Sequence, residues 1–416
     1  MERMISLVGL VTMIAIGWAM STHKRRVPWR ILLGGLALQF AFALLILKTT
    51  PGQVTFIWMG DFFKQLLSYV DRGAAFMFDV FPRPGDDPLP PQYTLWRSFA
   101  FGVLPTVIFF SSLMSILYHV GFMQKIVQFF AWIMQRTLGT SGAESLSAAA
   151  NIFVGQTEAP LVIRPYVSEM TMSELNAVMV GGFATIAGGV LAAYVAMGVN
   201  AGHLITASVI SAPAALLMAK LTLPETEHSK TMGTVELQVE KTSINVVEAA
   251  ATGASDGVKL ALNIAGMLIA FVALVAMGNA LFGWVGSYFF GFEGEQAWSM
   301  QRALGLVFAP LAFVMGIPWS ECRLAGEILG TKTVLNEFVA FADLATRQAE
   351  FSERSFTILT YALAGFANFS SIGIQLGGIG GIAPERRSDL ARLGLRAMIG
   401  GTLAAFMTAC VAGLLI

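Results

Sequence analysis

The sequence predicts an all-α protein that crosses a membrane many times. Of its 416 residues, 56% are hydrophobic and only 12% are charged. A typical soluble domain carries about twice that share of charged residues. The mean hydropathy is +0.68, and the apolar residues lie in blocks of about 20, the length of a helix that crosses a bilayer. A soluble fold is therefore excluded.

The remaining composition excludes several other classes of protein. The formal net charge is zero, which gives no electrostatic reason to expect a nucleic acid partner. Cys322 and Cys410 are too few and too isolated for a disulfide framework or a metal site. No nucleophile–base constellation, P-loop or paired metal motif occurs in the sequence, so we expect neither an enzyme nor a cofactor.

Eight transmembrane spans follow from the apolar blocks. They are predicted at residues 4–21, 29–48, 97–119, 174–198, 203–222, 262–284, 356–378 and 393–415. Three basic clusters orient these spans, because positive residues gather on the cytoplasmic side. The clusters contain Lys24, Arg25, Arg26 and Arg30; Lys220, Lys230 and Lys241; and Arg386, Arg387, Arg392 and Arg396. Both termini are therefore predicted to face outward.

Two further stretches carry apolar arms on either side of a polar tip that is too short to be an aqueous loop. The first is 141–168, with its tip at 155–160, and the second is 305–345, with its tip around 318–321. Irregular backbone at membrane depth survives only inside protein or beside a water-filled cavity. We predict two re-entrant helical hairpins. Each is followed by a pair of spans whose first member is interrupted by glycines, which indicates an inverted repeat.

These elements divide one membrane domain, 1–416, into five parts. The predicted parts are N-terminal scaffold helices (1–120), a first transport-unit repeat (121–223), a cytoplasmic linker (224–245), a long scaffold helix with its connector (246–300) and a second transport-unit repeat (301–416). The polar segment 243–262 is expected to lengthen the following span into a tilted helix. Residues 54–82 and 121–137 are predicted to form amphipathic helices at the membrane interface.

The sharpest candidate site residue is Glu158, at the tip of the first hairpin beside Gln156 and Thr157. An ionisable group inside hydrocarbon costs about 2.5–3.5 kcal/mol on insertion scales, so it needs a reason. A half-helix tip at mid-membrane offers free backbone groups to a solute or an ion. The alternative is a hairpin cap that is satisfied within the protein.

Glu337 is the corresponding acid of the second hairpin. Its carboxylate can accept two hydroxyl hydrogen bonds, as a sugar diol requires. The alternative is an ion pair with Lys332 or Arg323 within the hairpin.

The segment 365–373 interrupts an otherwise apolar helix. Asn368 and Ser371 stand three residues apart and so share one helical face, and Phe366 offers an aromatic surface to a base. Polar residues in spans also serve as contacts between helices, which is the alternative.

The glycine-rich run 181–189 lies in the middle of another span. Each glycine weakens a helix by about 1 kcal/mol relative to alanine, so an unwound stretch with free carbonyls is expected. Such carbonyls, with a hydroxyl, suit a sodium ion. Close helix packing is the alternative reading of the same glycines.

Three motifs resemble those of the concentrative nucleoside transporters, in the same order and over nearly the whole chain. They are NIFVGQTEAP at 151–160, NEFVA at 336–340 and GFANFSS at 365–371. The resemblance implies a homotrimer in which each protomer has eight spans, two re-entrant hairpins and interfacial helices. It also implies a scaffold and a transport unit that moves through the bilayer like an elevator.

The resemblance also implies roles for particular residues. The tip of the first hairpin would contact the nucleobase, the second hairpin and the broken helix would hold the ribose, and apolar side chains would surround both. In that order the residues are Gln156, Thr157 and Glu158; Glu337, Asn368 and Ser371; and Phe366, Val190 and Leu260.

For the coupling ion, the resemblance implies sodium between the first hairpin and the unwound helix. Asn151 and Thr185 would bind it by side chain, and Val154 and Ile186 by carbonyl. Thr185 departs from the expected serine but keeps the hydroxyl. Asn151 favours sodium, because proton-driven relatives lack this asparagine. The chain is thus expected to be a sodium-coupled nucleoside importer of a bacterial inner membrane, with periplasmic termini. The alternatives are a proton-coupled permease of the same fold, a membrane-embedded enzyme and a passive channel.

Overall fold

The computed structural model describes residues 2–78, 99–232, 243–291 and 299–416, and the regular elements in these ranges are all helices. The N-terminal part contains α1 (Glu2–Ala19), α2 (Trp29–Lys48), α3 (Thr50–Phe78) and the short α4 (Phe99–Gly102). The remaining helices form two series with the same order of elements, so the fold is best described as two repeats.

The first repeat comprises α5 (Leu104–His119), α6 (Phe122–Leu138), α7 (Gly142–Ala150), the 3-10 helix η2 (Ala159–Glu169), α8 (Met172–Ala184), α9 (Gly188–Ala196) and α10 (Ala201–Thr222). The second comprises α11 (Val246–Phe290), α12 (Met300–Val314), α13 (Trp319–Val334), α14 (Glu337–Thr346), α15 (Glu353–Leu363), α16 (Phe369–Ile382) and α17 (Arg387–Leu415), with the short η4 (Gln348–Glu350) and η5 (Pro384–Arg386) between them. Corresponding neighbours pack alike: α6 on α7 and α12 on α13, α7 on α8 and α13 on α15, α8 on α10 and α15 on α17.

The two repeats run in opposite directions, as the contact between their last helices shows. The Ser211 hydroxyl near the middle of α10 and the Thr408 hydroxyl in the last third of α17 are 3.1 Å apart. At the end of α10, Arg396 Nη1 donates to the carbonyl of Thr222 at 3.0 Å. The end of α10 therefore lies beside the beginning of α17, so the helices are antiparallel and the repeat has inverted topology.

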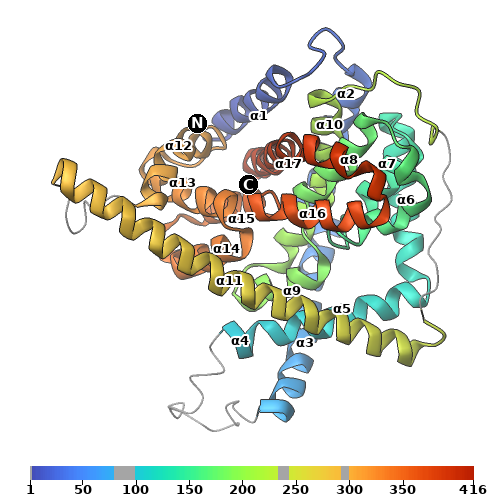
Figure 1. Cartoon of the computed structure of the whole chain (residues 1–416), viewed down its shortest axis with the longest axis horizontal. Coiled ribbons are helices and arrows are strands. Elements are labelled where there is room, and N and C mark those ends of the chain that lie inside the picture. The colour runs from blue at the N-terminus through green and yellow to red at the C-terminus, as the bar shows by residue number, and fades with distance from the viewer. Residues whose placement is uncertain (1, 79–98, 233–242, 292–298) are drawn as a thin grey trace.

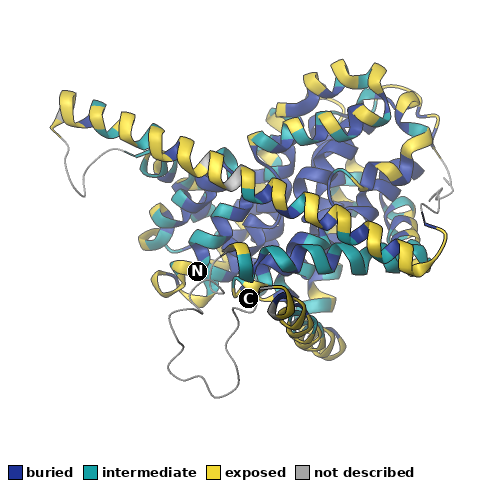
Figure 2. Ribbon diagram, turned by 60° about the horizontal axis from the view of Figure 1, so that its bottom comes forward, coloured by how far each residue is buried: buried dark blue, intermediate teal, exposed yellow. Residues whose placement is uncertain are grey.

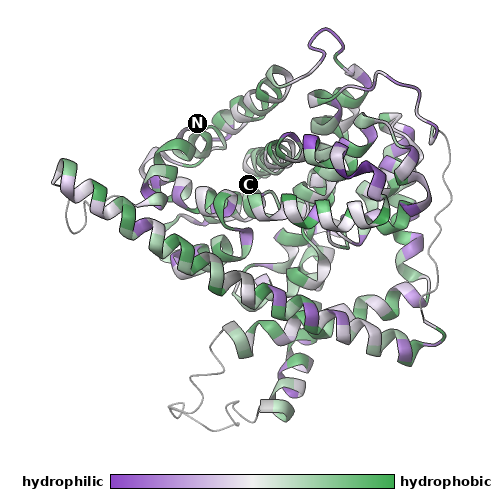
Figure 3. Cartoon of the chain, in the orientation of Figure 1, coloured by the Kyte–Doolittle hydropathy of each residue, from purple (hydrophilic) through white to green (hydrophobic). Residues whose placement is uncertain are grey.

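Seven stretches among the described residues are long and apolar enough to cross a membrane. Their bounds are Glu2–Ala19, Trp29–Lys48, Ala100–His119, Met172–Ala196, Ala201–Thr222, Val272–Phe289 and Pro384–Leu415. Seven of the predicted spans overlap them, although 97 and 98 lie outside the described residues. The eighth, 356–378, is not one continuous span, because α15 and α16 are separated at residues 364–368. Figure 3 shows the apolar character of most helices and the hydrophilic connection between α1 and α2.

The basic clusters lie on one side of the molecule. Arg396 Nη1 also donates to the carbonyl of Met20 at 3.1 Å, and Arg30 Nη2 donates to that of Arg136 at 3.0 Å. Arg386 Nη1 reaches the carbonyl of Ser168 at 3.0 Å, while Lys241 lies outside the described residues. The two chain ends lie together elsewhere, since Arg3 Nε donates to the carbonyl of Ile416 at 2.9 Å. The compartment that each side faces stays a prediction.

Helix α11 is 45 residues long, or about 68 Å at 1.5 Å per residue. This confirms the prediction that the polar segment after 243 lengthens the following span. The helix runs diagonally across the molecule and extends beyond it, and exposed positions follow it over much of its length (Figures 1 and 2). The predicted amphipathic helices also exist, as α3 and α6, although residues 79–82 lie outside the described part.

The second hairpin differs from its prediction. The expected tip, around Pro318 and Glu321, is the start of α13, where Pro318 is the N-cap, as suits a residue that cannot donate a backbone hydrogen bond. The turn between α12 and α13 corresponds to the turn between α6 and α7, which leads into the first hairpin. Each of these two turns contains a glycine with positive φ (Gly139, 72°; Gly316, 100°). The buried polar turn is at Leu335 and Asn336, between α13 and α14.

Candidate functional site

The tip of the first hairpin is fastened to the break in the first broken helix. Helix α7 ends at Ala150, and residues 151–158 form an irregular turn before η2. The backbone N–H of Gly188, at the start of α9, donates to the carbonyl of Phe153 at 2.9 Å. Gly155 leaves room for the carboxylate of Glu158, whose Oε2 would collide with a Cβ at that position. A Cβ on Gly188 would lie 2.7 Å from the same carbonyl oxygen of Phe153, so this contact requires glycine at the start of α9.

Glu337 at the second tip is 4% exposed and held from two sides. Its Oε1 accepts from the Tyr194 hydroxyl at 3.2 Å, and its Oε2 accepts from Asn368 Nδ2 at 2.9 Å. Neither Lys332 nor Arg323 lies within ion-pair distance of Glu337 in the described structure: Lys332 Nζ donates to the carbonyl of Ala362 at 2.8 Å, and Arg323 lies beside Glu327 at 3.8 Å. The carboxylate is thus oriented by neutral donors.

The two broken helices have short breaks that touch each other. The first break is residues 185–187, narrower than the predicted glycine-rich stretch, and the second is 364–368. A Cβ on Gly365 would lie 2.8 Å from the carbonyl oxygen of Phe183, so only glycine fits this crossing. Asn368 is the N-cap of α16, where its Oδ1 accepts from the backbone N–H of Ser371 at 2.9 Å.

Each hairpin tip contacts the broken helix of the other repeat. Gln156 Nε2 donates to the Ser371 hydroxyl of α16 at 3.1 Å, and Gln156 Oε1 accepts from Gln375 Nε2 at 3.0 Å. In the reverse direction Glu337 contacts Tyr194 of α9. Figure 1 shows α16 extending from α15 toward α7 and α8, which makes the first contact possible. The structure therefore brings Gln156, Glu337, Asn368 and Ser371 into one buried polar centre.

Sequence reasoning missed Gln375 and Tyr194. Gln375 is fully buried, donates also to the carbonyl of Met179 at 3.1 Å and stands four residues after Ser371, hence on the same helical face. That spacing was a usable signal. Tyr194 gave no signal of its own, since a tyrosine in a span resembles an ordinary core aromatic.

A cavity of about 420 Å³ opens beside the first tip, a size within the usual range for small-molecule sites. Glu158 and Leu260 line it, together with the start of α9 and Ser115 and Tyr118 of α5. Thr157 donates to Glu158 Oε2 at 3.0 Å. The cavity lies between the first hairpin and the α5–α11 pair. The buried Val190 and Phe366 and the second-tip residues are not part of its described lining.

The predicted sodium ligands lie where two helices end. Asn151 follows the last residue of α7, and Thr185 follows the last residue of α8, where its hydroxyl donates to the carbonyl of Gly181 at 2.9 Å. Asn151 Nδ2 donates to the carbonyl of Ser147 at 3.0 Å and lies 3.3 Å from the Cβ position of Gly181. Asn151 Oδ1 is buried without a hydrogen-bond partner among the described residues. A buried unpaired oxygen is costly, and a cation would satisfy it. Val154 and Ile186 belong to the same hairpin turn and helix break.

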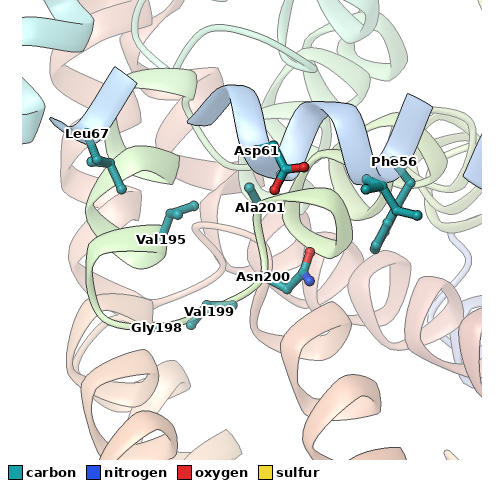
Figure 4. Close-up of a pocket in the computed structure, with 10 residues that line it drawn as sticks. Phe56, Asp61, Leu67, Val195, Gly198, Val199, Asn200 and Ala201 are labelled. Carbon is teal, nitrogen blue, oxygen red and sulfur yellow. The ribbon is translucent and has the colours of Figure 1, made fainter. Parts of the chain in front are cut away.

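A second cavity, of about 350 Å³, lies between α3 and the turn from α9 to α10 (Figure 4). Phe56 and Asp61 of α3, Val195 near the end of α9, and Val199 and Asn200 of the turn line it. None of the predicted site residues belongs to it, so it plays no part in the site described above.

Two hairpins whose tips meet two broken helices around a polar centre define a secondary transporter. Three family models match the chain: Na+ dependent nucleoside transporter N-terminus at residues 8–81, nucleoside recognition at 100–201, and Na+ dependent nucleoside transporter C-terminus at 203–413. The chain belongs to the Na+-dependent nucleoside transporter family. This confirms the predicted resemblance, the helical membrane fold and the expectation that the chain is not an enzyme.

Similar proteins and structures agree with this assignment. The chain is 43% identical to the uncharacterized transporter YutK of Bacillus subtilis, over 99% of this chain and 98% of that protein. It is 46% identical to solute carrier family 28 member 3 of Eptatretus stoutii, over 100% of this chain but 61% of that protein. The chain thus spans about three fifths of the length of such animal relatives. The structure of CNTnw in an inward-facing substrate-bound state matches with a TM-score of 0.91 and 41% identity, over 100% of this chain and 98% of that one.

Proposed function

We propose that this protein imports nucleosides by symport with sodium. The observation that carries the proposal is the buried polar centre where each hairpin tip contacts the broken helix of the other repeat. Glu337, held by Tyr194 and Asn368, presents a carboxylate of fixed orientation, as two ribose hydroxyls would require. Gln156, Thr157 and Glu158 face the base from the other tip, and Asn368 and Ser371 complete the ribose contacts.

Apolar residues would complete the site around the base and ribose. Leu260 lies on the wall of the 420 Å³ cavity, while Val190 and Phe366 are buried, at 4% and 9% exposed, and do not belong to its described lining. Their contact with a nucleoside requires the transport unit to move relative to α11. We therefore propose an elevator-like movement of the hairpin-containing unit against the scaffold of α5 and α11.

Sodium would bind between the first tip and the first break. Asn151 Oδ1 supplies an unpaired oxygen, the Thr185 hydroxyl lies one turn from Gly181, and the carbonyls of Val154 and Ile186 complete the set. An ion there would order the turn 151–158 and thereby place Gln156 and Glu158 for the base. By linkage, the nucleoside must tighten sodium binding by the same factor.

The membrane, the orientation of the termini and the oligomeric state are also part of the proposal. We infer a bacterial inner membrane with both termini in the periplasm, since the three basic clusters share one side. We propose a homotrimer, because the resemblance to the family implies one.

Uridine uptake into proteoliposomes tests the proposal directly. With an inward sodium gradient, uridine should accumulate above its outside concentration, and with choline at the same pH it should not. Failure of both sodium and acid-outside gradients to move any nucleoside would refute the function.

A proton-coupled permease of the same fold remains the second candidate. It is favoured by one observation: among the described residues, no lysine or arginine lies within ion-pair distance of Glu337, so this buried acid has only neutral hydrogen-bond partners. Uptake driven by an acid-outside gradient, indifferent to sodium, would select this candidate and discard the ion site at Asn151.

A further inference from the structure

The inverted repeat places a second junction of helix ends opposite the sodium site. In the first repeat the C-terminus of α7 meets the C-terminus of α8. In the second, the C-terminus of α13 meets the C-terminus of α15, since α13 packs on α15 as α7 packs on α8. Each helix C-terminus carries about half a negative charge and unpaired carbonyls. Both junctions therefore attract a cation.

The second junction already contains a cation of the protein's own. Lys332 lies in the last turn of α13, is 1% exposed and donates through Nζ to the carbonyl of Ala362 at 2.8 Å. Ala362 is the penultimate residue of α15, so its carbonyl belongs to the last turn and has no partner within the helix.

The first junction contains no such side chain. Among the described residues the buried lysines are Lys220 and Lys332, and no arginine is buried. Lys220 forms an ion pair with Glu144, in the first turn of α7, at the opposite end of that helix from Asn151. The oxygens at the first junction, Asn151 Oδ1 and the Ser147 hydroxyl, are buried and without partners in the described structure.

We propose that the Lys332 ammonium is a resident cation that occupies, in the second repeat, the position that sodium takes in the first. It joins the end of α13 to the end of α15 permanently, whereas the corresponding junction between the ends of α7 and α8 is completed only when an ion binds. The proposal rests on the proposed sodium coupling and adds a consequence: each protomer needs one sodium ion, because its second cation is covalently attached.

The test compares Lys332→Met, which keeps the length of the side chain and removes its charge, with Lys332→Arg, which keeps the charge. Melting temperature is measured for the purified full chain in sodium chloride and in choline chloride at equal ionic strength. Lys332→Met should melt several degrees lower than the wild type in choline, and Lys332→Arg should retain most of the wild-type value. The wild type should show a sodium Hill coefficient of about 1 for uridine binding.

Three results would overturn the proposal. Lys332→Met could melt like the wild type, Lys332→Arg could lose as much stability as Lys332→Met, or the wild type could bind sodium with a Hill coefficient of about 2. If Lys332→Met yields no folded protein, Lys332→Arg alone decides: a folded, sodium-responsive Lys332→Arg supports the resident cation, and an unfolded one refutes it. If the proposed function is wrong, wild-type uptake will not depend on sodium. The comparison of melting temperatures between the Lys332 variants in choline chloride remains valid in that case.

Discussion

The two hairpins differ in how firmly each holds the carboxylate at its tip. Glu158 stands in an eight-residue irregular turn, is exposed to a cavity and bonds only its neighbour Thr157 among the described residues. Glu337 follows a two-residue turn, is buried and bonds Tyr194 and Asn368 from two other helices. The same topological position is therefore loose in one repeat and fixed in the other.

Under the proposed function, this difference indicates which hairpin couples sodium binding to nucleoside binding. A site held in its binding geometry before the ligand arrives loses little entropy on binding, whereas a loose site must be ordered by something. The second hairpin is joined to α15 by Lys332, and its Glu337 is oriented by neutral donors, so under the proposed function it would be a preformed site for the ribose. The first hairpin has unpaired oxygens at its base among the described residues, so under the proposed function an ion bound there would control the order of the whole tip.

The largest effect is expected at the fixed carboxylate. Glu337→Gln leaves one acceptor where two donors and the ribose hydroxyls require more, so uridine uptake should fall at least about 100-fold. Glu327→Gln, on α13 beside Arg347 and without contact to Glu337, is the matched control and should transport nearly normally. Initial rates of labelled uridine uptake provide the measurement, and near-normal transport by Glu337→Gln would remove this residue from the site.

A second large effect is expected at the loose carboxylate. Glu158→Gln should lower uptake at low uridine about 10- to 100-fold, because binding loses one charge-assisted hydrogen bond. Calorimetric titration of uridine in saturating sodium measures it. Glu169→Gln, an exposed acid of the same hairpin paired with Lys230, should leave binding unchanged. Equal losses at Glu158 and Glu337 would weaken the distinction between the tips.

A third effect separates ion from substrate. Asn151→Ala removes the unpaired oxygen at the base of the first hairpin, so the sodium concentration for half-maximal uptake should rise about tenfold. The control is Asn176→Ala, a buried asparagine of α8 that donates to the carbonyl of Ala219 in α10 and should leave sodium dependence unchanged. A sodium titration of uptake distinguishes them, and an unshifted titration in Asn151→Ala would refute the ion site.

The sequence predicted the position of the first hairpin's tip more accurately than that of the second. The run from Asn151 to Pro160 places amide, hydroxyl and carboxylate side chains at a glycine and a proline, and this local chemistry is enough to predict a polar turn. In the second hairpin the proline at 318 marks a helix start, whereas the true tip contains neither glycine nor proline. Its backbone is held by the Asn336 cap, which accepts from Val339 N–H at 3.0 Å.

Apart from the resemblance, the residue pattern does not predict which side chains of the two repeats contact each other. Gln156 and Gln375 are 219 positions apart, and Tyr194 and Glu337 are 143 apart. Only the antiparallel placement of the repeats brings these pairs together. The sequence pattern indicates that a polar residue in a span has a partner, but the identity of the partner depends on the tertiary fold.

The smallest expected effect tests whether the second hairpin tip holds Glu337 in place independently of sodium. Tyr194→Phe removes one hydrogen bond to Glu337, worth about 1 kcal/mol, so uridine binding should weaken about fivefold. Tyr361→Phe is the matched control, because this buried tyrosine bonds His203 at 3.2 Å and does not contact Glu337. Uridine titrations at several sodium concentrations measure both variants.

The way in which the affinity loss of Tyr194→Phe varies with sodium concentration tests whether the ion also orders the second tip. If the second tip is preformed, the variant should lose the same factor of affinity at every sodium concentration, since sodium acts on the first tip alone. If the loss grows as sodium falls, the ion also orders Glu337, and the two hairpins operate as one coupled unit rather than as a fixed clamp and a switchable one. The Tyr194 hydroxyl, which joins the first repeat to the second tip, would then transmit that order.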